Sequence, residues 1–488
     1  MDGSISRGTG REGELSVDQL VVLVRRLERT IHELRRENER LKQQLKERDG
    51  QNPTQRLDEE YSLKAEEQRS RGKRRKKQKS PRRGRRSTEQ KLAEADRHED
   101  VFPSDAAPED CTLHRSGVVW RIEHGRAVRV AYHVYRSPRG EIPTIPGTLG
   151  RSEYGIEISV SLAFMVFILR LSMDKVCRQL EFFWGLKLSK SQADALLNRL
   201  ARAWEPEFDM LCTLLAGSAV VHADETSWSI NSVWAFLSEK ARVLLFGVHK
   251  DAATLATLLS KDLFNGVVVS DDAAVYRGFS RAQKCWAHLI RKAIKLTLLQ
   301  PENEEYRTFL TGLLKLYRKA RRLQQDHRLK QTTRRQKVLG LEDDLWVLCG
   351  SRFADTTPTA TQAERDFLNL VHELLRLMED EELFTFVIHP QVPGTNNEAE
   401  RGLRDAANDR KTGRTSKTIC GARRRTVLTS VLESLRQSLP DFTLRHVLAE
   451  VTLWLSTGRS CFRQLLDCYG LPPPASSLLD VLLPPTAA

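Results

Sequence analysis

Apolar residues recur along this chain with two different periods, and each period predicts a different kind of element. From Leu20 they lie alternately four and three residues apart, as a heptad repeat requires. The a and d positions of that repeat are Leu20, Val24, Leu27, Ile31, Leu34, Asn38, Leu41 and Leu45. This pattern predicts a parallel coiled coil within 1–50 that makes the protein a homodimer or a higher oligomer. A single amphipathic helix that packs on its own chain is the alternative.

The period changes to two in the stretch VVWRIEHGRAVRVAYHVYR. Apolar and polar residues alternate there on both sides of a His-Gly pair, so we expect a small β unit within 101–150. Cys111 and His114 have the spacing of zinc ligands, but no second pair of ligands follows them. We therefore expect no closed zinc site in this unit.

Two helical patterns follow within 151–215, LSMDKVCRQLEFFWG and LSKSQADALLNRLARAW. Ser189 and Gln192 have the spacing of a capping box at the start of the second helix. A short helix, a tight turn and a capped basic helix predict a helix-turn-helix-like DNA-binding region. An ordinary helical hairpin fits the same pattern.

The segment 216–295 predicts an α/β core. Three strand patterns, VVHA, SVWAFLS and RVLLFGVHK, precede the helix DAATLATLLS, the strand GVVVS, a short fifth strand and the helix HLIRKAIKL. This is the order of elements in the ribonuclease H-like fold. We expect the first strand to end at Asp224 and Glu225, and the fourth to end at Asp271 and Asp272. Both pairs of acids would then lie at one edge of one sheet.

A third acid is expected from a later helix, because two carboxylates are too few to hold divalent cations. The stretch PGTNNEAERGLRDAANDRK offers Glu398 and Glu400. Glu400 and Arg404 would share one helix face with Asn396 or Asn397. Glu398 has the spacing of a capping-box partner for Thr395. A competing local interpretation is that Glu400 only caps Asn397.

Charge is concentrated in one block. The chain has 488 residues and a net charge of +14, and residues 69–86 alone hold twelve Lys and Arg and no acid. Such a block cannot pack, so we predict a disordered basic linker over 51–100 that binds DNA phosphates. Its densest run is Lys73, Arg74, Arg75, Lys76 and Lys77. A solubilising tether is the alternative.

The eight cysteines include no CxxC pair, which argues against a disulfide framework or a tetrathiolate zinc site. The start of the sequence shows no signal-peptide pattern, and the most apolar stretch, 158–169, is too short to span a bilayer. We therefore expect a cytoplasmic, nucleoid-associated protein without a membrane segment.

The chain resembles the insertion sequence 66 family of bacterial transposases in four motifs: HADET around Asp224, SDDAAVY, CWAHLIRK from Cys285, and NNEAERGLR around Glu400. The resemblance implies a DDE transposase whose metal-binding triad is Asp224, Asp271 and Glu400. It also implies a ribonuclease H-like core over 216–295 and 391–435. A helical insertion over 296–390 would interrupt this core, and a helical tail over 436–488 would follow it.

The sequence departs from the family pattern in two places. The stretch YRSPRG stands where cysteines of a zinc motif are expected, so 101–150 is a degenerate zinc-finger position. Asp272 stands in place of the usual glycine after the second acid. The first departure removes a zinc site, and the second leaves two candidates for the second metal ligand.

The implied chemistry uses two Mg²⁺ (or Mn²⁺) ions to free 3′-OH ends at terminal inverted repeats and to join them to target DNA. The resemblance allows accessory proteins from the same element. Arg401, Arg404, Lys411 and Arg414 would hold DNA near the metals, unless they form only a solvated basic face. Cys285, His288 and Asn397 are expected to support the site rather than to bind metal. A nuclease without strand transfer and an inactive DNA-binding derivative are the alternatives.

Overall fold

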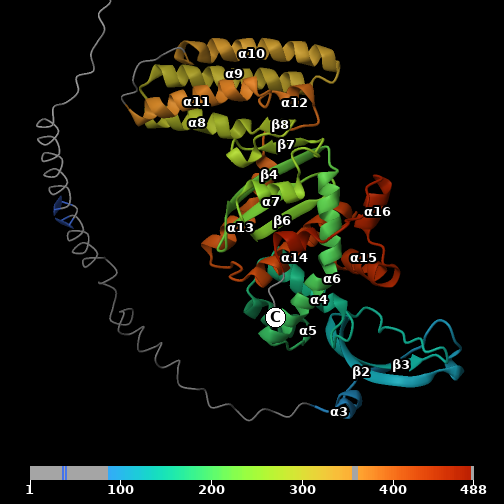
Figure 1. Cartoon of the computed structure of the whole chain (residues 1–488). Coiled ribbons are helices and arrows are strands. Elements are labelled where there is room, and N and C mark those ends of the chain that lie inside the picture. Colours follow the sequence, from blue (N-terminus) through green and yellow to red (C-terminus); the bar gives the residue numbers. More distant parts are fainter. Residues whose placement is uncertain (1–35, 38, 41–85, 354–360, 485–488) are drawn as a thin grey trace, which may run out of the picture. The chain divides into compact units, whose positions relative to one another are not determined.

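The computed structural model describes residues 36–37, 39–40, 86–353 and 361–484 (Figure 1). The chain divides into two compact units, 1–85 and 86–488, and the second is described below. The predicted coiled coil lies outside the described residues, except that residues 36–37 and 39–40 are helical. The basic run from Lys73 to Lys77 also lies outside them.

The described part of the predicted linker, from residue 86 onward, forms regular structure, contrary to the disorder expected over 51–100. Residues Thr88–Ala93 form helix α3, and Arg97–Val101 form strand β1. A capping box between Ser87 and Gln90 starts α3. Acidic residues are interspersed with basic ones from Glu89 onward, so this stretch lacks the self-repulsion of the basic block before it.

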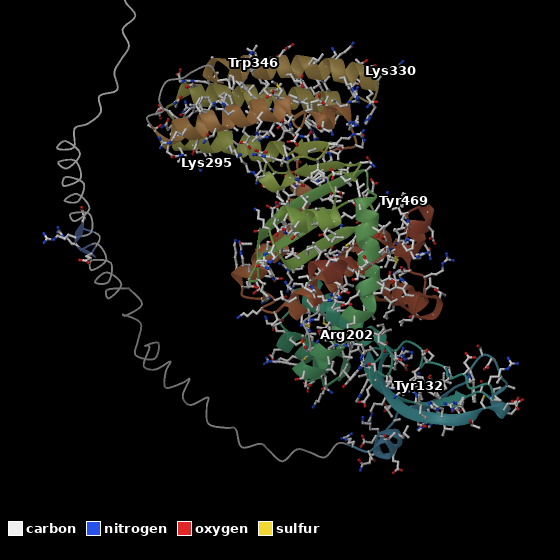
Figure 2. The ribbon with its side chains drawn as sticks, viewed as in Figure 1. Tyr132, Arg202, Lys295, Lys330, Trp346 and Tyr469 are labelled. Atoms are coloured by element: carbon white, nitrogen blue, oxygen red, sulfur yellow. The ribbon has the colours of Figure 1, made fainter. Side chains whose placement is uncertain are left out.

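The small β unit contains the hairpin that the alternating pattern predicts. Strands β2 (Thr112–Glu123) and β3 (Arg126–Arg136) pair antiparallel, and β1 pairs with β3 in parallel. His124 and Gly125 join them with φ of 49° and 77°, the positive values that a tight two-residue hairpin turn needs. Tyr132, labelled in Figure 2, is buried on β3.

The next helices enter the main core. They are α4 (Ile156–Ala163), a π-helical turn (Phe164–Ile168), α5 (Met173–Trp184) and α6 (Lys190–Ala216). The capping box at Ser189 and Gln192 is present. Helix α6 is longer than the pattern predicts because it continues through Pro206, beyond which Phe208 and Leu211 are fully buried. Among the described helices, none is long and apolar enough to cross a membrane.

A five-stranded sheet lies at the centre, with the order β6-β5-β4-β7-β8. Strand β4 pairs antiparallel with β5 and parallel with β7. The outer pairs are β5 with β6, antiparallel, and β7 with β8, parallel. The elements are β4 (Val220–Ser227), β5 (Ser232–Leu237), β6 (Arg242–Val248), α7 (Ala252–Leu258), β7 (Val267–Ser270), a 3₁₀ turn (Ala274–Tyr276) and β8 (Ala282–Lys284).

The two faces of the sheet pack against different helices, because successive side chains on a strand point to opposite faces. Val221 and Ala223 of β4 join the core formed with α6 and with α14 (Ile419–Ser438). On the opposite face, Val233 and Ala235 of β5 pack against Leu403 of α13 (Asn397–Lys411).

A helical bundle interrupts the core between β8 and α13, as the resemblance implies. Its helices are α8 (Trp286–Leu299), α9 (Glu304–Gln325), α10 (Gln331–Phe353), α11 (Gln362–Glu379) and the short α12 (Thr385–Ile388). They enclose an apolar core of their own, in which Trp286 stacks on Tyr317 and packs against Phe384. Figure 1 shows α8 to α11 side by side.

The last part of the core differs from the predicted single closing helix, because α13 and α14 are separate helices. The predicted tail is also part of the core. Its helices are α15 (Leu444–Thr457), α16 (Cys461–Cys468) and α17 (Leu478–Leu482). Helices α16 and α17 contact α6, and Phe462, Leu466 and Leu479 are fully buried in the same apolar cluster as α6.

Both edges of the central sheet are covered. Thr426, Ser430 and Ser434 recur at every fourth position of α14, and their hydroxyls accept hydrogen bonds from the backbone N–H groups of 246, 244 and 242 on β6, each 2.9 Å long. A rise of about 6 Å per four helical residues nearly matches the roughly 6.8 Å between alternate strand residues. At the other edge, Lys284 N–H of β8 donates to the carbonyl of Glu382 over 2.8 Å.

Candidate active site

Asp224 and Glu225 lie within strand β4, which continues to Ser227. The expectation that the strand ends at this pair of acids is therefore wrong. The antiparallel partner β5 holds the backbone extended, with Asp224 opposite Ala235 and Glu225 opposite Trp234. Because side chains alternate along a strand, the two carboxylates point to opposite faces of the sheet rather than out together.

Glu225 is neutralised by its own surroundings. Its side chain is only 2% exposed, and Lys250 Nζ lies 2.6 Å from its Oε1. The buried Tyr276 donates its hydroxyl proton to the other oxygen, Oε2. Burial and the neighbouring Glu225 carboxylate raise the pKa of Tyr276 well above its usual value, so this hydroxyl stays a donor. Glu225 is therefore an acid that stabilises the fold, because the chain itself compensates its charge.

Asp224 and Asp271 come from neighbouring strands of the sheet. The parallel pairing of β4 and β7 ends with His222 opposite Val269; Asp224 lies two residues further along β4, and Asp271 directly follows the end of β7. Asp271 Oδ1 accepts a hydrogen bond of 3.0 Å from the backbone N–H of Ala273, which turns the chain directly after β7.

The geometry separates the two candidates for the second acid. Asp272 pairs with Arg376 of α11 and lies 3.8 Å from Arg277. It is therefore tied to the insertion by cations of the chain itself. Asp271, in contrast, contributes a negative charge to the surroundings of Asp224.

Glu400 lies in the first turn of α13, a helix that contacts β4 and β5. Its carboxylate accepts from Arg291 of α8 over 2.6 Å, and His288 Nδ1 is 3.6 Å away. Glu400 is thus held on the side of the site formed by α8. The carboxylate contacts Arg291 and faces His288, and α13 begins without a side-chain cap, so the interpretation of Glu400 as only a cap for Asn397 has no support here.

Asn396, rather than the predicted supporting residue Asn397, ties these elements together. Asn396 is fully buried. Its Nδ2 donates to the carbonyl of Ala223, directly before Asp224, over 2.8 Å, and its Oδ1 lies 3.1 Å from His222 Nδ1. Its backbone N–H points at Cys285 Sγ over 3.1 Å. Asn397, in contrast, is exposed.

The electrostatics single out Asp224. Burial raises the pKa of its carboxyl group to about 7, and the negative charges of Glu225, Asp271 and Glu400 act in the same direction. One hydrogen bond from the backbone N–H of Glu225 opposes this shift. A carboxylate surrounded by like charges favours a proton or a metal ion.

Glu398 points away from this group, as its position two residues before Glu400 predicts. It does not form the predicted capping box, because α13 begins without a side-chain cap. Instead, its carboxylate lies 2.9 Å from Arg242 of β6 and 3.7 Å from His222 Nε2. The better partner is a full positive charge, which outweighs a neutral hydrogen-bond donor.

A second set of possible metal ligands overlaps the first. Among the described residues, the ligand atoms of Cys285, His288 and Glu400 all lie within 4.8 Å of one another. Burial is the main cause that raises the pKa of Cys285 and lowers that of His288. Cys111 and His114 belong to no such group in the described part of the chain.

The predicted DNA-binding residues of α13 and the following loop are exposed, at Arg401, Arg404, Lys411 and Arg414. Arg414 donates to the carbonyl of Arg170. The sequence analysis overlooked Arg410, which donates to the carbonyl of Ser227 over 2.9 Å at the end of β4. Only its position one residue before Lys411 in a basic stretch could have indicated it.

Comparison with known proteins identifies the family. A model described as the Transposase IS66 family matches residues 151–424, which include Asp224, Asp271 and Glu400. No curated protein matches the chain. Since the matched residues make up more than half of the sequence, this chain belongs to the Transposase IS66 family.

Proposed function

We propose that this protein is a DDE transposase with a ribonuclease H-like core, which cuts DNA at the ends of an insertion element and joins the freed 3′ ends to target DNA. Family membership supports transposition as the general activity. The sheet order β6-β5-β4-β7-β8 supports the core assignment. The proposed triad comes from the middle of β4, from the residue after β7 and from the first turn of α13.

The uncompensated charge at Asp224 carries this proposal. Asp224 lies on the strand next to β7, which Asp271 follows, and the pKa of Asp224 is raised to about 7 by burial and by three acidic neighbours. The chain compensates Glu225 with Lys250 and Tyr276, and Asp272 with Arg376. Oxygen ligands left with excess negative charge fit Mg²⁺ or Mn²⁺, which prefer carboxylates.

Asp224, Asp271 and Glu400 would hold these ions, and we propose two ions per site. A bound pair supplies Lewis-acid activation of water or of a 3′-OH and stabilises the leaving oxygen. The side chain of Asn396 fixes the backbone next to Asp224, while its backbone N–H contacts Cys285 and its carbonyl accepts from Glu400 N–H. Arg291 orients the Glu400 carboxylate. These contacts keep three distant segments in register.

DNA is the proposed substrate and partner. The exposed Arg401, Arg404 and Lys411 follow Glu400 on α13, where they would contact phosphates without reading sequence. The exposed face of α6, which includes Arg199 and Arg202, is the part of the helix-turn-helix-like region that remains available to DNA. Dimerisation through 1–50, phosphate binding through 69–86 and help from accessory proteins remain proposals.

The test uses the full chain with Mg²⁺ and two DNA substrates. One carries an element end with flanking DNA, and the other carries a pre-cut end with a free 3′-OH together with a target plasmid. We expect nicking at the element end in the first reaction and joined product in the second. Cutting without joining would identify a nuclease instead, and DNA binding without either reaction would identify an inactive derivative.

A further inference from the structure

Cys285, His288 and Glu400 form a compact group with mixed ligand chemistry. Cys285 precedes α8, His288 lies in the first turn of α8, and Glu400 lies in the first turn of α13. Their ligand atoms all lie within 4.8 Å of one another, and His288 Nδ1 is 3.6 Å from Glu400 Oε1. In a tetrahedral zinc site, bonds of about 2.0–2.1 Å separate nitrogen and oxygen ligands by about 3.4 Å. The observed spacing is close to that value.

Burial raises the pKa of the Cys285 thiol, but the backbone groups around it favour the thiolate that a metal ion would bind. Its side chain is buried, and the backbone N–H of Asn396 points at Sγ over 3.1 Å. Cys285 also occupies the N-cap of α8, a helix of 14 residues. Backbone N–H groups and the positive end of a helix stabilise a thiolate. A cysteine kept only for packing needs none of these features.

His288 leaves a ligand atom without a partner. Its Nδ1 is buried, and no hydrogen bond to it is present among the described residues. The distance of 3.6 Å to Glu400 is too long for a hydrogen bond. Buried polar atoms without a protein partner are uncommon, and a bound water or ion is one explanation for them. This atom faces the Glu400 carboxylate, on which the group converges.

We propose that Cys285, His288 and Glu400 bind a zinc-class divalent cation, with the fourth coordination position open to water. Thiolate and imidazole ligands favour Zn²⁺ over Mg²⁺, so this site differs in chemistry from the carboxylate site of Asp224 and Asp271. The proposal replaces the expectation that Cys285 and His288 only support the active site. Metal binding here does not depend on the proposed transposase reaction.

One consequence does rest on the proposed function. Glu400 belongs to both sets of ligands, so a zinc-class ion that holds it would compete with the Mg²⁺ site for the same carboxylate. Micromolar Zn²⁺ should then inhibit Mg²⁺-dependent cutting, and His288→Ala should relieve this inhibition. Binding of a zinc-class ion to Glu400 would then regulate the Mg²⁺-dependent reaction.

Cobalt provides the direct test, because Co²⁺ bound to a thiolate absorbs in the near ultraviolet and is displaced by Zn²⁺. The full chain is titrated with Co²⁺ in the absence of DNA and Mg²⁺. We expect a thiolate-to-cobalt band that saturates at one ion per chain and disappears when Zn²⁺ is added. Cys285→Ser should abolish the band. His288→Ala should lower the Zn²⁺ affinity by about 100-fold or more, because it removes a direct ligand, whereas loss of an outer-shell partner costs about 10- to 100-fold.

Cys420→Ser is the matched control, because Cys420 is an exposed cysteine in the first turn of another helix, α14. It should leave the band unchanged. Melting curves of the three variants establish that each is folded, and His288→Ala keeps the test decisive if Cys285→Ser does not fold. Absence of the band in the natural chain would overturn the proposal. A band that survives both Cys285→Ser and His288→Ala would also overturn it.

Failure of this inference and failure of the proposed function are distinguishable. A cobalt band in a chain that neither cuts nor joins DNA would leave the metal site standing and refute the transposase reaction. Cutting and joining of DNA by a chain that shows no cobalt band would support the transposase reaction and refute the metal site.

Discussion

Two neighbouring acids on strand β4, Glu225 and Asp224, have opposite electrostatic surroundings on the two faces of the strand. On the face toward α6, Glu225 is enclosed by Lys250 and Tyr276, so the chain itself compensates its charge. On the face toward α13, Asp224 has acidic neighbours and one backbone hydrogen bond. Acidic character alone therefore does not mark a site. A carboxylate whose charge the protein leaves uncompensated is the better indicator of a cation-binding site.

On helix α13 both glutamates have an arginine partner, and the two partners differ in exposure. Glu398 is paired with Arg242 of the sheet, and Glu400 is directed toward Arg291 and His288. Arg242 and Glu398 join two elements of the core, whereas Arg291 is exposed and can exchange its carboxylate for a phosphate. The comparison therefore predicts that one acid of each pair serves the fold and the other serves the reaction.

The largest expected effect separates the two glutamates of α13. Glu400→Gln should lower Mg²⁺-dependent cutting by several orders of magnitude, because it removes an anionic oxygen from the proposed metal site. DNA binding and melting temperature should change little. The measurement is cutting of an element-end substrate, alongside a binding assay and a melting curve.

Glu398→Gln is the matched control, with the same chemical change two residues away. It should retain most of the cutting and lose up to about 1 kcal/mol of unfolding free energy, the scale of a partly exposed ion pair. If Glu398→Gln is inactive and Glu400→Gln is active, the roles of the two acids are reversed. Full activity of both variants would refute the triad.

An intermediate effect, on the free energy of unfolding, is expected for substitutions of Glu225. Glu225→Ala removes the acceptor of the buried Tyr276 hydroxyl, so unfolding free energy should fall by about 1–3 kcal/mol. Glu225→Gln keeps an oxygen for Tyr276 and should lose less. Denaturant unfolding of both variants measures the difference. A folded Glu225→Gln protein that has lost all cutting would show that Glu225 takes part in the reaction. The contrast between a structural Glu225 and a metal-binding Asp224 would then be refuted.

The smallest expected effect is the change in protein stability with pH that the ionisation of Asp224 causes. Its pKa is about 7 in the folded chain and about 4 in an unfolded one, so the folded state binds the proton more tightly. The stabilisation from this group is complete below about pH 4 and is lost as the pH rises through about 7. Glu207, whose burial also raises its pKa to about 7, adds a slope of the same sign.

Asp224→Asn should remove its share of that slope and raise the melting temperature of the metal-free protein at about pH 8 by a few degrees. Mg²⁺ should stabilise the natural chain more at about pH 8 than at about pH 5, and should do little for the variant. Melting curves with and without Mg²⁺ measure both effects. An identical pH slope in the natural chain and in Asp224→Asn would contradict the assignment of uncompensated charge to Asp224.

Much of the secondary structure could be predicted from the sequence, because local patterns determine it. The period of two predicts β2 and β3, and the Ser189–Gln192 spacing predicts the start of α6. The ends of elements were harder to predict. Pro206 lacks an N–H and should end a helix, yet α6 continues through it because the following turns are buried in the core.

The candidate site was predicted in part. The motifs indicated Asp224, Asp271 and Glu400, which the structure distributes over β4, the end of β7 and α13. The partners of these acids could not be predicted, because they come from distant segments. Nothing local distinguishes Asn396 from Asn397, and only the folded chain buries the first against Ala223. Likewise, Arg242 is 156 residues before Glu398, so the sequence pattern favours a local capping box with Thr395 instead of this ion pair.

The hydroxyl row of α14 has a consequence for self-association. A sheet edge with free N–H groups can recruit a strand from a second molecule, which leads to edge-to-edge aggregation. Thr426, Ser430 and Ser434 already occupy three donors of β6, and the carbonyl of Glu382 occupies one on β8. Copies of this protein that meet at high local concentration on one DNA molecule therefore find these donors taken. At these positions, contacts between copies would rely on side chains, which substitution can change, rather than on backbone groups.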